Sequence, residues 1–296
     1  MKFRNLALTL LLAGGISASC IKEDHSDCRN IYRLALSYFG DGQTEIFHEK
    51  IESVQMYVFD AQNNCVVSRE LSKAEVEARL TTLPSLVSGE YKIVCIGNAD
   101  QTEVENLSAG DLEQITFAST DYLAGRTVSG NDPLYWSSID YTINPYDMFQ
   151  LEQTKTTEFK SSHYDVVVEA TGVPMSTKST PSLSIILEGV SPQTDFLNKA
   201  KGTPTDYVLE TSYNDKGDLT ASCNIMRHSP NQEVYLVITG ATGDEIVRVN
   251  VAEHIAEHNI DMTKQECVIP FKFEFTSADV AVTVPDWFIE NVTPEF

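Results

Sequence analysis

The stretch Val54-Gln55-Met56-Tyr57-Val58-Phe59, followed by Asp60-Ala61-Gln62-Asn63-Asn64 and Cys65-Val66-Val67, decides the class of fold. Val54, Met56 and Val58 face one way and the residues between them face the other, which is the period of a β-strand. The polar segment that follows is typical of a hairpin loop. The third segment then predicts the returning strand, so the whole stretch predicts a β-hairpin.

The same pattern recurs along the chain, where short apolar runs are separated by turn residues. Further strands are predicted at residues 32–38, 91–96, 164–170, 183–187, 207–211, 234–239, 245–249, 268–275 and 280–284. Helical signals are few: a capping box, Ser72-Lys73-Ala74-Glu75, starts a helix that we expect to end near Leu80, and a second helix is predicted at residues 250–259. Many strands without regular alternation with helices favour an all-β fold of sandwich domains.

The length of 296 residues favours two domains. We expect a signal peptide at residues 1–19, a tether at 20–30, an N-terminal β-sandwich at 31–160 and a C-terminal β-sandwich at 161–296. Residues 100–162 are expected to be largely irregular, with strands near Tyr141 and Met148. The net charge is −22, from 21 basic and 43 acidic residues. This charge argues against nucleic-acid binding and against electrostatic attraction to an anionic membrane.

The N-terminus has the layout of an export signal. Lys2 and Arg4 precede an apolar run at residues 6–13, which is too short to span a bilayer. The following Ser17-Ala18-Ser19-Cys20 resembles a bacterial lipobox, although strict lipoboxes have an apolar residue where Ser17 stands. We therefore predict cleavage before Cys20, with diacylglycerol and a fatty acyl chain on this residue as the only bound group. An ordinary signal peptide with a chance cysteine is the alternative.

Charged residues follow the predicted lipid site directly. Lys22, Glu23 and Asp24 resemble the surface-export signal of lipoproteins in anaerobic gut and oral bacteria. The alternative is that these residues are only a solvated spacer.

The cysteine count leaves the disulfides open. The chain has six cysteines, and five remain when Cys20 is set aside. The spacing C-x-x-C is absent, which removes support for zinc-ribbon and thioredoxin-type sites. Cys223 and Cys267 are a candidate disulfide in the C-terminal half, because an exported protein is in an oxidising compartment. The alternative is that most of these residues are buried free thiols.

One motif resembles an enzyme. His254-Ile255-Ala256-Glu257-His258 matches the inverted zinc-peptidase pattern, in which two histidines one helical turn apart bind Zn²⁺. Val251, His254, Ile255 and His258 also form one helical stripe, which is typical of a helix packed on a sheet. We favour this structural interpretation, and we predict neither enzymatic activity nor a metal site.

Aromatic residues cluster in the irregular stretch. Tyr135, Trp136, Tyr141 and Tyr146 could stack on a sugar, so a glycan-binding surface lipoprotein of a saccharide-uptake system is an alternative function. Residues of this kind also cap the end of a sandwich core.

Several stretches, in order along the chain, resemble the FimB-type fimbrial anchor lipoproteins. They are Cys20-Ile21-Lys22-Glu23-Asp24 with Ser26-Asp27-Cys28, Tyr57-Val58-Phe59-Asp60, Gly89-Glu90-Tyr91-Lys92-Ile93-Val94 with Gly97-Asn98, Asp132-Pro133-Leu134-Tyr135, Val282-Thr283-Val284-Pro285-Asp286-Trp287, and Val292-Thr293-Pro294-Glu295-Phe296. The resemblance extends over essentially the whole mature chain.

This resemblance implies two transthyretin-like Greek-key sandwiches and a fimbrial subunit of the cell outer membrane, exposed at the surface. Such a protein would hold or cap a fimbrial shaft and support cell adhesion. Its partners would be the shaft subunits and, through lipid, the outer membrane. Shafts of this kind assemble by strand addition, so Val280, Val282 and Val284 are a candidate assembly strand. A fixed edge strand of the second domain is the alternative.

Overall fold

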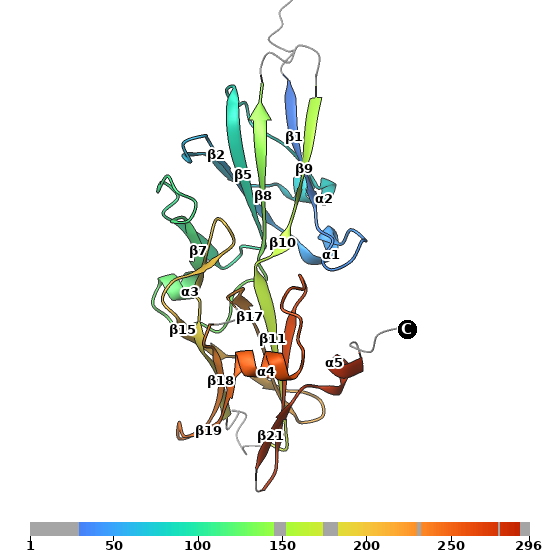
Figure 1. Ribbon diagram of the computed structural model, residues 1–296, viewed down its shortest axis with the longest axis vertical. Helices are drawn as coiled ribbons and strands as arrows, with labels where there is room; N and C mark the ends of the chain where they lie inside the picture. Colours follow the sequence, from blue (N-terminus) through green and yellow to red (C-terminus); the bar gives the residue numbers. More distant parts are fainter. Residues whose placement is uncertain (1–29, 145–151, 174–182, 230–231, 278, 291–296) are drawn as a thin grey trace, which may run out of the picture.

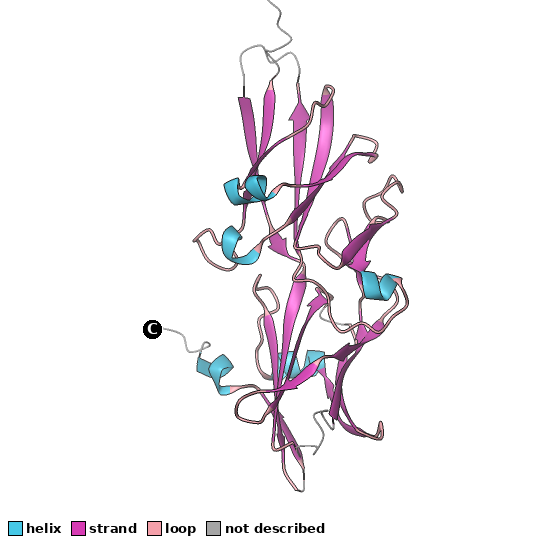
Figure 2. Cartoon of the chain, turned by 180° about the vertical axis from the view of Figure 1, so that it is seen from behind, coloured by secondary structure: helices cyan, strands magenta, loops and turns pink. Residues whose placement is uncertain are grey.

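Residues 30–144, 152–173, 183–229, 232–277 and 279–290 are described by the computed structural model of the chain. They form two β-sandwiches that follow one another along the long axis of the molecule (Figure 1). Strands dominate and the helices are short, as the view from behind shows (Figure 2). The predicted fold class, all-β with two sandwich domains and short helices, is confirmed.

The N-terminal sandwich consists of a five-stranded and a three-stranded sheet. The larger sheet has the order β10 (Lys160–Ser161), β8 (Tyr135–Ile143), β5 (Gly89–Gly97), β2 (Val54–Phe59) and β3 (Cys65–Glu70). The smaller has the order β4 (Leu80–Thr82), β1 (Ile31–Ser37) and β9 (Glu152–Glu158). The predicted hairpin is therefore present as β2 and β3, which pair antiparallel. Strands β1 and β9 run parallel.

Strand β2 of the five-stranded sheet is covered on both faces. On β2, Met56 and Val58 belong to the core between the two N-terminal sheets. Tyr57 and Phe59, on the opposite face, belong to a second apolar cluster. Because both faces are covered, the strand carries large apolar residues at consecutive positions. A sheet with one face in water would instead alternate apolar and polar residues.

A small third sheet covers that second face. Its order is β14 (Ala200–Lys201), β13 (Gln193–Asp195), β7 (Thr116–Ser119) and β6 (Thr102–Glu105). Strands β6 and β7 come from the N-terminal half of the chain, and β13 and β14 come from the C-terminal half. Thr194 pairs with Phe117 across that division. The two halves of the chain therefore share a hydrogen-bonded sheet. The predicted domain boundary between residues 160 and 161 did not include such a shared sheet.

The C-terminal sandwich consists of a five-stranded and a four-stranded sheet. The first has the order β16 (Thr211–Tyr213), β17 (Leu219–Met226), β11 (His163–Thr171), β20 (Val268–Phe275) and β21 (Val280–Thr283). The second has the order β15 (Thr205–Leu209), β12 (Leu183–Val190), β18 (Tyr235–Gly240) and β19 (Glu245–Asn250). Their core includes Val128, which is 2% exposed and comes from the N-terminal half. The parallel pair of β11 and β20 corresponds to β1 and β9 in the first sandwich.

The prediction of one continuous strand at residues 207–211 is wrong, because two strands meet there. Strand β15 ends at Leu209 in the four-stranded sheet, and β16 begins at Thr211 in the five-stranded sheet. Glu210 lies between them, where the chain changes from one sheet to the other. Such a change of sheet at a corner is a feature of sandwich packing.

Both predicted helices are present and begin where the sequence predicts. α2 (Lys73–Ala78) has the capping box, in which the Ser72 hydroxyl accepts the Glu75 N–H and Glu75 reaches back. The helix ends before Leu80, because Arg79 takes a left-handed conformation and Leu80 already belongs to β4. α4 (Val251–Glu257) is capped by Asn250. The other helices are α1 (Phe47–Lys50), α3 (Thr120–Leu123) and α5 (Asp286–Glu290).

The prediction that residues 100–162 are irregular is wrong. The strand near Tyr141 is present as β8, but β6, β7, β9 and β10 also lie in this range. Met148 and the strand predicted near it lie outside the described residues. The missed strands β6 and β9 also have polar residues at their less exposed positions, Thr102 in β6 and Gln153, Lys155 and Thr157 in β9. The alternation of apolar and polar residues is therefore weak in the sequence.

Candidate functional site

The predicted assembly strand lies at one edge of the C-terminal sandwich. β21 pairs antiparallel with β20, with Val282 opposite Phe273 and Val280 opposite Phe275. Within the described residues no strand pairs with its other side. An edge strand presents a row of unpaired backbone N–H and C=O groups, to which a further strand can pair. This edge is therefore the candidate assembly surface of the molecule.

The side chains of β21 are shared between core and solvent. Val280 and Val282 are half-buried and pack against the C-terminal core, whereas Ala281 and Thr283 are exposed. Val284 follows the strand and is 7% exposed. In this structure the strand completes its own sandwich, which is the fixed-edge alternative. Donation of the strand to a neighbouring subunit stays a prediction.

The first described strand and the edge strand lie at opposite ends of the molecule. Figure 1 shows β1 beginning at one end of the long axis and β21 lying at the other. The chain that precedes β1 carries the predicted lipid site Cys20 and the predicted export residues Lys22, Glu23 and Asp24. These four residues lie outside the described residues. A group attached to the tether would therefore hold the N-terminal sandwich and leave β21 at the distant end.

The two sandwiches meet at a polar contact centred on Glu266. The Glu266 carboxylate accepts hydrogen bonds from the Tyr38 hydroxyl and the Lys50 ammonium group, and it lies 3.3 Å from the Tyr135 hydroxyl. Burial, with Glu266 nearby, raises the pKa of Tyr38 and Tyr135. The two hydroxyls therefore stay protonated and can donate.

Further hydrogen bonds hold the loop before β20 against the N-terminal sandwich. Asp41 accepts the backbone N–H groups of Gln265 and Glu266 at 2.7 and 3.0 Å. The Arg227 guanidinium donates to the Gln265 carbonyl at 2.8 Å and to the His163 carbonyl at 3.1 Å. The loop at residues 261–267 is thereby fixed in position between the two sandwiches.

An apolar contact joins the sandwiches on another side. Phe196, which follows β13, is 0% exposed and packs edge-on against Tyr57, Phe59 and Phe117. The Trp136 indole donates to the Phe196 carbonyl at 3.1 Å. The sequence analysis missed Phe196, Asp41 and Glu266. No local pattern marks them, because their partners come from distant parts of the chain.

The histidine motif is part of the packing of α4. His254 is 3% exposed, stacks on Phe271 at 4.2 Å between ring centroids, and its Nε2 lies 2.9 Å from the Pro270 carbonyl oxygen. His258 Nδ1 lies 3.0 Å from the His254 carbonyl oxygen. A ring that donates through Nε2 has only Nδ1 left for a metal. Within the described residues, no group of three His, Cys, Asp or Glu side chains is arranged to hold a metal ion.

The predicted disulfide between Cys223 and Cys267 is not formed, and both residues are free thiols. Cys223 lies on β17, and Cys267 precedes β20, with β11 between the two strands. Strands two positions apart in a sheet are about 9.5 Å from each other, which is beyond the reach of a disulfide. Burial raises the pKa of Cys223 to about 12 and that of Cys267 to about 11, so both stay protonated.

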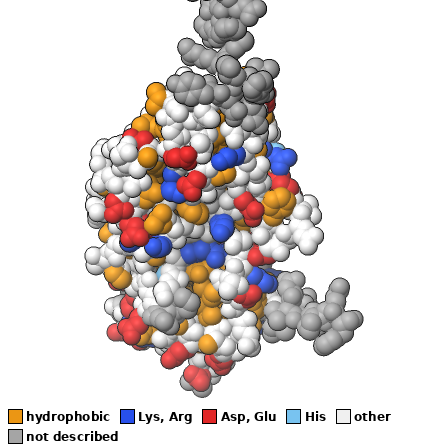
Figure 3. All heavy atoms as spheres, turned by 45° about the horizontal axis from the view of Figure 1, so that its top comes forward, with side chains coloured by type: hydrophobic (Ala, Val, Ile, Leu, Met, Phe, Trp, Pro, Cys, Tyr) orange, Lys and Arg blue, Asp and Glu red, His pale blue; other side chains and the backbone are white. Residues whose placement is uncertain are grey.

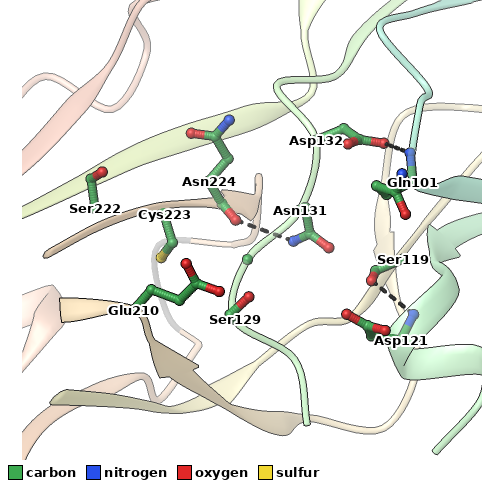
Figure 4. Close-up of a pocket in the computed structure, with 11 residues that line it drawn as sticks. Gln101, Ser119, Asp121, Ser129, Asn131, Asp132, Glu210, Ser222, Cys223 and Asn224 are labelled. Carbon is green, nitrogen blue, oxygen red and sulfur yellow. Dashed lines mark hydrogen bonds between the residues drawn. The ribbon is translucent and has the colours of Figure 1, made fainter. Parts of the chain in front are cut away.

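A polar hollow of about 420 Å³ lies where the N-terminal half crosses the C-terminal sandwich. Figure 4 shows Ser129, Asn131 and Glu210 pointing into it, beside Cys223. The Asn131 amide donates to the Asn224 carbonyl at 3.4 Å, and Asp132 accepts the Gln101 N–H at 2.7 Å. The lining contains carboxylates, amides and hydroxyls but neither an aromatic nor a basic side chain.

The aromatic residues predicted to stack on a sugar are mostly internal. Tyr135 and Tyr141 are 3% and 0% exposed, and the Tyr141 hydroxyl donates to backbone carbonyls of Arg33 and Gln153. Trp136 is half-buried and bonded to Phe196. Tyr146 lies outside the described residues. The three described residues cap and fill the sandwich ends and do not form a binding platform.

Charges on the molecular surface are mixed. Acidic and basic side chains alternate with apolar ones over the face shown in Figure 3. In the described part of the chain, no helix has the length and apolar character needed to cross a bilayer.

Two β-sandwiches with an edge strand at one end, and with buried histidine and cysteine side chains, define an all-β protein of the sandwich class. The sequence comparison gives the family. The chain belongs to the fimbrillin-A associated anchor proteins Mfa1 and Mfa2, whose family model matches residues 25–293. The resemblance to fimbrial anchor proteins is confirmed, and the protein is a fimbria-associated adhesion protein of the cell surface. None of the curated proteins matches the chain.

Solved structures share the fold at low sequence identity. A candidate adhesin from Bacteroides ovatus has a TM-score of 0.69 and 15% identity, with 88% of this chain and 95% of that chain covered. The fimbrial anchor protein Mfa2 from Porphyromonas gingivalis has a TM-score of 0.65 and 15% identity, with 87% and 98% covered. A Bacteroides thetaiotaomicron protein described as a candidate polysaccharide binding protein has a TM-score of 0.68 and 14% identity, with 87% and 96% covered.

Proposed function

We propose that the protein anchors a fimbrial shaft to the outer membrane through lipid on Cys20. The observation that carries the proposal is the placement of the start of β1, which follows the tether in the sequence, and of the edge strand β21 at opposite ends of the long axis (Figure 1). An anchor needs one end at the membrane and a surface for the shaft at the other. Acyl chains stabilise membrane attachment by about 0.8 kcal/mol per buried CH₂, so a multiply acylated cysteine holds without basic residues.

The rest of the proposal concerns export and assembly. Lys22, Glu23 and Asp24 lie on the tether next to the lipid, where a transport receptor could read them, so that the anchor reaches the cell surface. Shaft subunits then pair with the free edge of β21 or receive the strand itself. The bound shaft is thereby held, or capped, at its base.

Both sandwiches are tied into one body by the Glu266 and Phe196 contacts. A pull on the shaft is therefore transmitted through folded protein to the tether. The alternative function, glycan binding by the cluster at Tyr135, Trp136 and Tyr141, loses its basis because these side chains are packed within the fold.

The test is a strain that lacks the protein, complemented with the wild-type chain or with Cys20→Ala. Wild-type protein should fractionate with outer membranes, co-purify with fimbriae and keep fimbriae on washed cells. Cys20→Ala protein should be soluble, and fimbriae should be shed into the medium. Membrane retention of the Cys20→Ala protein would disprove lipidation at this residue. Fimbriae that stay cell-bound without the protein would disprove the anchor role.

A further inference from the structure

A second hollow, on the C-terminal sandwich, has a different character from the polar one in Figure 4. It measures about 430 Å³ and lies between α5 and the segment that follows α4. Its lining combines two aromatic side chains with apolar and polar residues: Asn259, Ile260, Asp261, Lys264, Glu266, Cys267, Val268, Trp287 and Phe288. The proposed anchoring does not use this hollow.

Trp287 is the exposed aromatic residue of this hollow. It is 43% exposed, although tryptophan is a residue type that folding normally covers. Ile260 and Cys267 are 7% and 3% exposed, and Phe288 packs on the C-terminal core, so the base beside the indole is rigid and apolar. An indole over such a base offers a surface for the apolar face of a ligand.

Polar groups surround this surface. Asn259 and Lys264 are exposed, and among the described residues neither the Asn259 amide nor the Lys264 ammonium group has a hydrogen-bond partner. One oxygen of Asp261 accepts from the Thr263 N–H at 2.9 Å and from the Thr263 hydroxyl. The other oxygen accepts no hydrogen bond from the residues that the structure describes. The lining has one ammonium group, Lys264, and two carboxylates, of which Glu266 is already paired with Lys50. The chain as a whole has a net charge of −22.

From this arrangement we propose that the Trp287 hollow binds a neutral pyranose unit of a saccharide. The C–H face of a pyranose ring is apolar and can lie on an indole, while its equatorial hydroxyls both donate and accept hydrogen bonds. The Asn259 amide, the Lys264 ammonium group and the free Asp261 oxygen provide donors and acceptors for them. The hollow has the size and the mixed lining of a small-molecule site. The strongly negative chain disfavours an acidic sugar.

The chain contains two tryptophans, which makes the site measurable. Trp136 is half-buried and donates to the Phe196 carbonyl, so changes in fluorescence on ligand addition report mainly on Trp287. Purified mature protein is titrated with maltohexaose, N-acetyllactosamine and 3′-sialyllactose, with fluorescence and acrylamide quenching as readouts. We expect saturable binding of at least one of the two neutral saccharides, with protection of Trp287 from acrylamide, and weaker binding of the sialylated one.

Variants decide whether the hollow is the site. Trp287→Ala should weaken binding by about tenfold or more, measured by calorimetry, and Trp287→Phe should retain more of it. Lys264→Ala should also weaken binding, whereas Lys216→Ala, in the turn between β16 and β17, should not. The melting temperature of each variant shows whether it is folded. Trp287→Ala should still retain fimbriae on cells, because anchoring through Cys20 and β21 does not depend on saccharide binding in this hollow.

Three results would overturn the proposal. One is the absence of saturable binding by either neutral saccharide. Another is binding that Trp287→Ala and Lys264→Ala leave unchanged. The third is binding of a peptide from the shaft subunit, lost in Trp287→Ala, without any saccharide binding, since the hollow would then belong to the assembly surface.

Discussion

Tyr38 and Glu266 are 228 positions apart in the chain, yet the Tyr38 hydroxyl donates a hydrogen bond to the Glu266 carboxylate. The first residue follows the opening strand of the N-terminal sandwich, and the second precedes β20 of the C-terminal sandwich. Lys50 forms an ion pair with the same carboxylate, whose side chain is 24% exposed. One acidic side chain therefore contributes to the orientation of the two sandwiches, together with the Asp41 and Phe196 contacts.

Replacing Glu266 by Ala should therefore destabilise the protein. Tyr38 and Lys50 would lose their acceptor in a partly buried place, at a cost of about 2–3 kcal/mol in the free energy of unfolding. Chemical denaturation measures it. Glu274→Ala is the matched control. Glu274 forms an ion pair with Lys272 on β20 and is about half exposed, so the loss of this pair should cost less than about 1 kcal/mol. Equal losses for the two variants would show that the Glu266 contact is not stabilising.

Phe196→Ala should open the apolar contact between the sandwiches. The ring is fully buried among three aromatic side chains, so its removal leaves a cavity and should cost about 3–5 kcal/mol. We expect wild-type protein to unfold in one calorimetric transition and the variant to unfold in two. Val66→Ala, at a side chain that is 47% exposed, should change stability by less than about 0.5 kcal/mol. A single transition in Phe196→Ala would mean that the other contacts suffice for cooperativity.

Stability should decrease as the pH falls below about 6.5. Burial lowers the pKa of His163, His228 and His254 from the ordinary value of 6.5. The unfolded chain then binds protons at a higher pH than the folded chain, so the stability present above 6.5 is lost as the pH falls toward the folded pKa values. Thermal unfolding at pH 7.5 and 5.5 measures the loss. His254→Gln should reduce the loss of stability between these two pH values. An equal loss in the His254→Gln variant and in the wild-type protein would contradict the assignment to His254.

Val282→Asp tests the role of β21. Val282 packs on the C-terminal core, so a charge there should cost several kcal/mol and lower the melting temperature if the strand stays in its own domain. If the strand is donated, the variant should fold and reach the membrane but fail to retain fimbriae. Ala281→Asp, on the exposed side of the strand, is the control for folding. Normal stability together with normal retention of fimbriae would remove β21 from the mechanism.

Replacing Lys22, Glu23 and Asp24 by Ala tests the export prediction. These residues precede the folded sandwiches, so the melting temperature should not change. If a receptor reads the triplet, protease added to intact cells should no longer degrade the protein, while its total amount stays constant on immunoblots. Unchanged protease sensitivity would show that these three residues are only a solvated spacer and not an export signal.

The features that sequence alone determined are local. The period-two pattern at Val54, Met56 and Val58 specifies a strand because alternate side chains leave the backbone on opposite sides. The Ser72 and Glu75 pair specifies a helix start because both partners lie within one turn. The motif order along the chain also indicated the fimbrial anchor family, which the family match confirms.

The features that only the tertiary structure decided are contacts between residues far apart in the chain. The sequence shows two apolar faces on β2 but not that the second is covered by a sheet drawn from both halves. It shows Cys223 and Cys267 but not that β11 separates them. It contains nothing that pairs Tyr38 with Glu266 or places Val128 in the C-terminal core. Local propensities act within a few residues, whereas such contacts form only when packing of the sheets brings distant segments together.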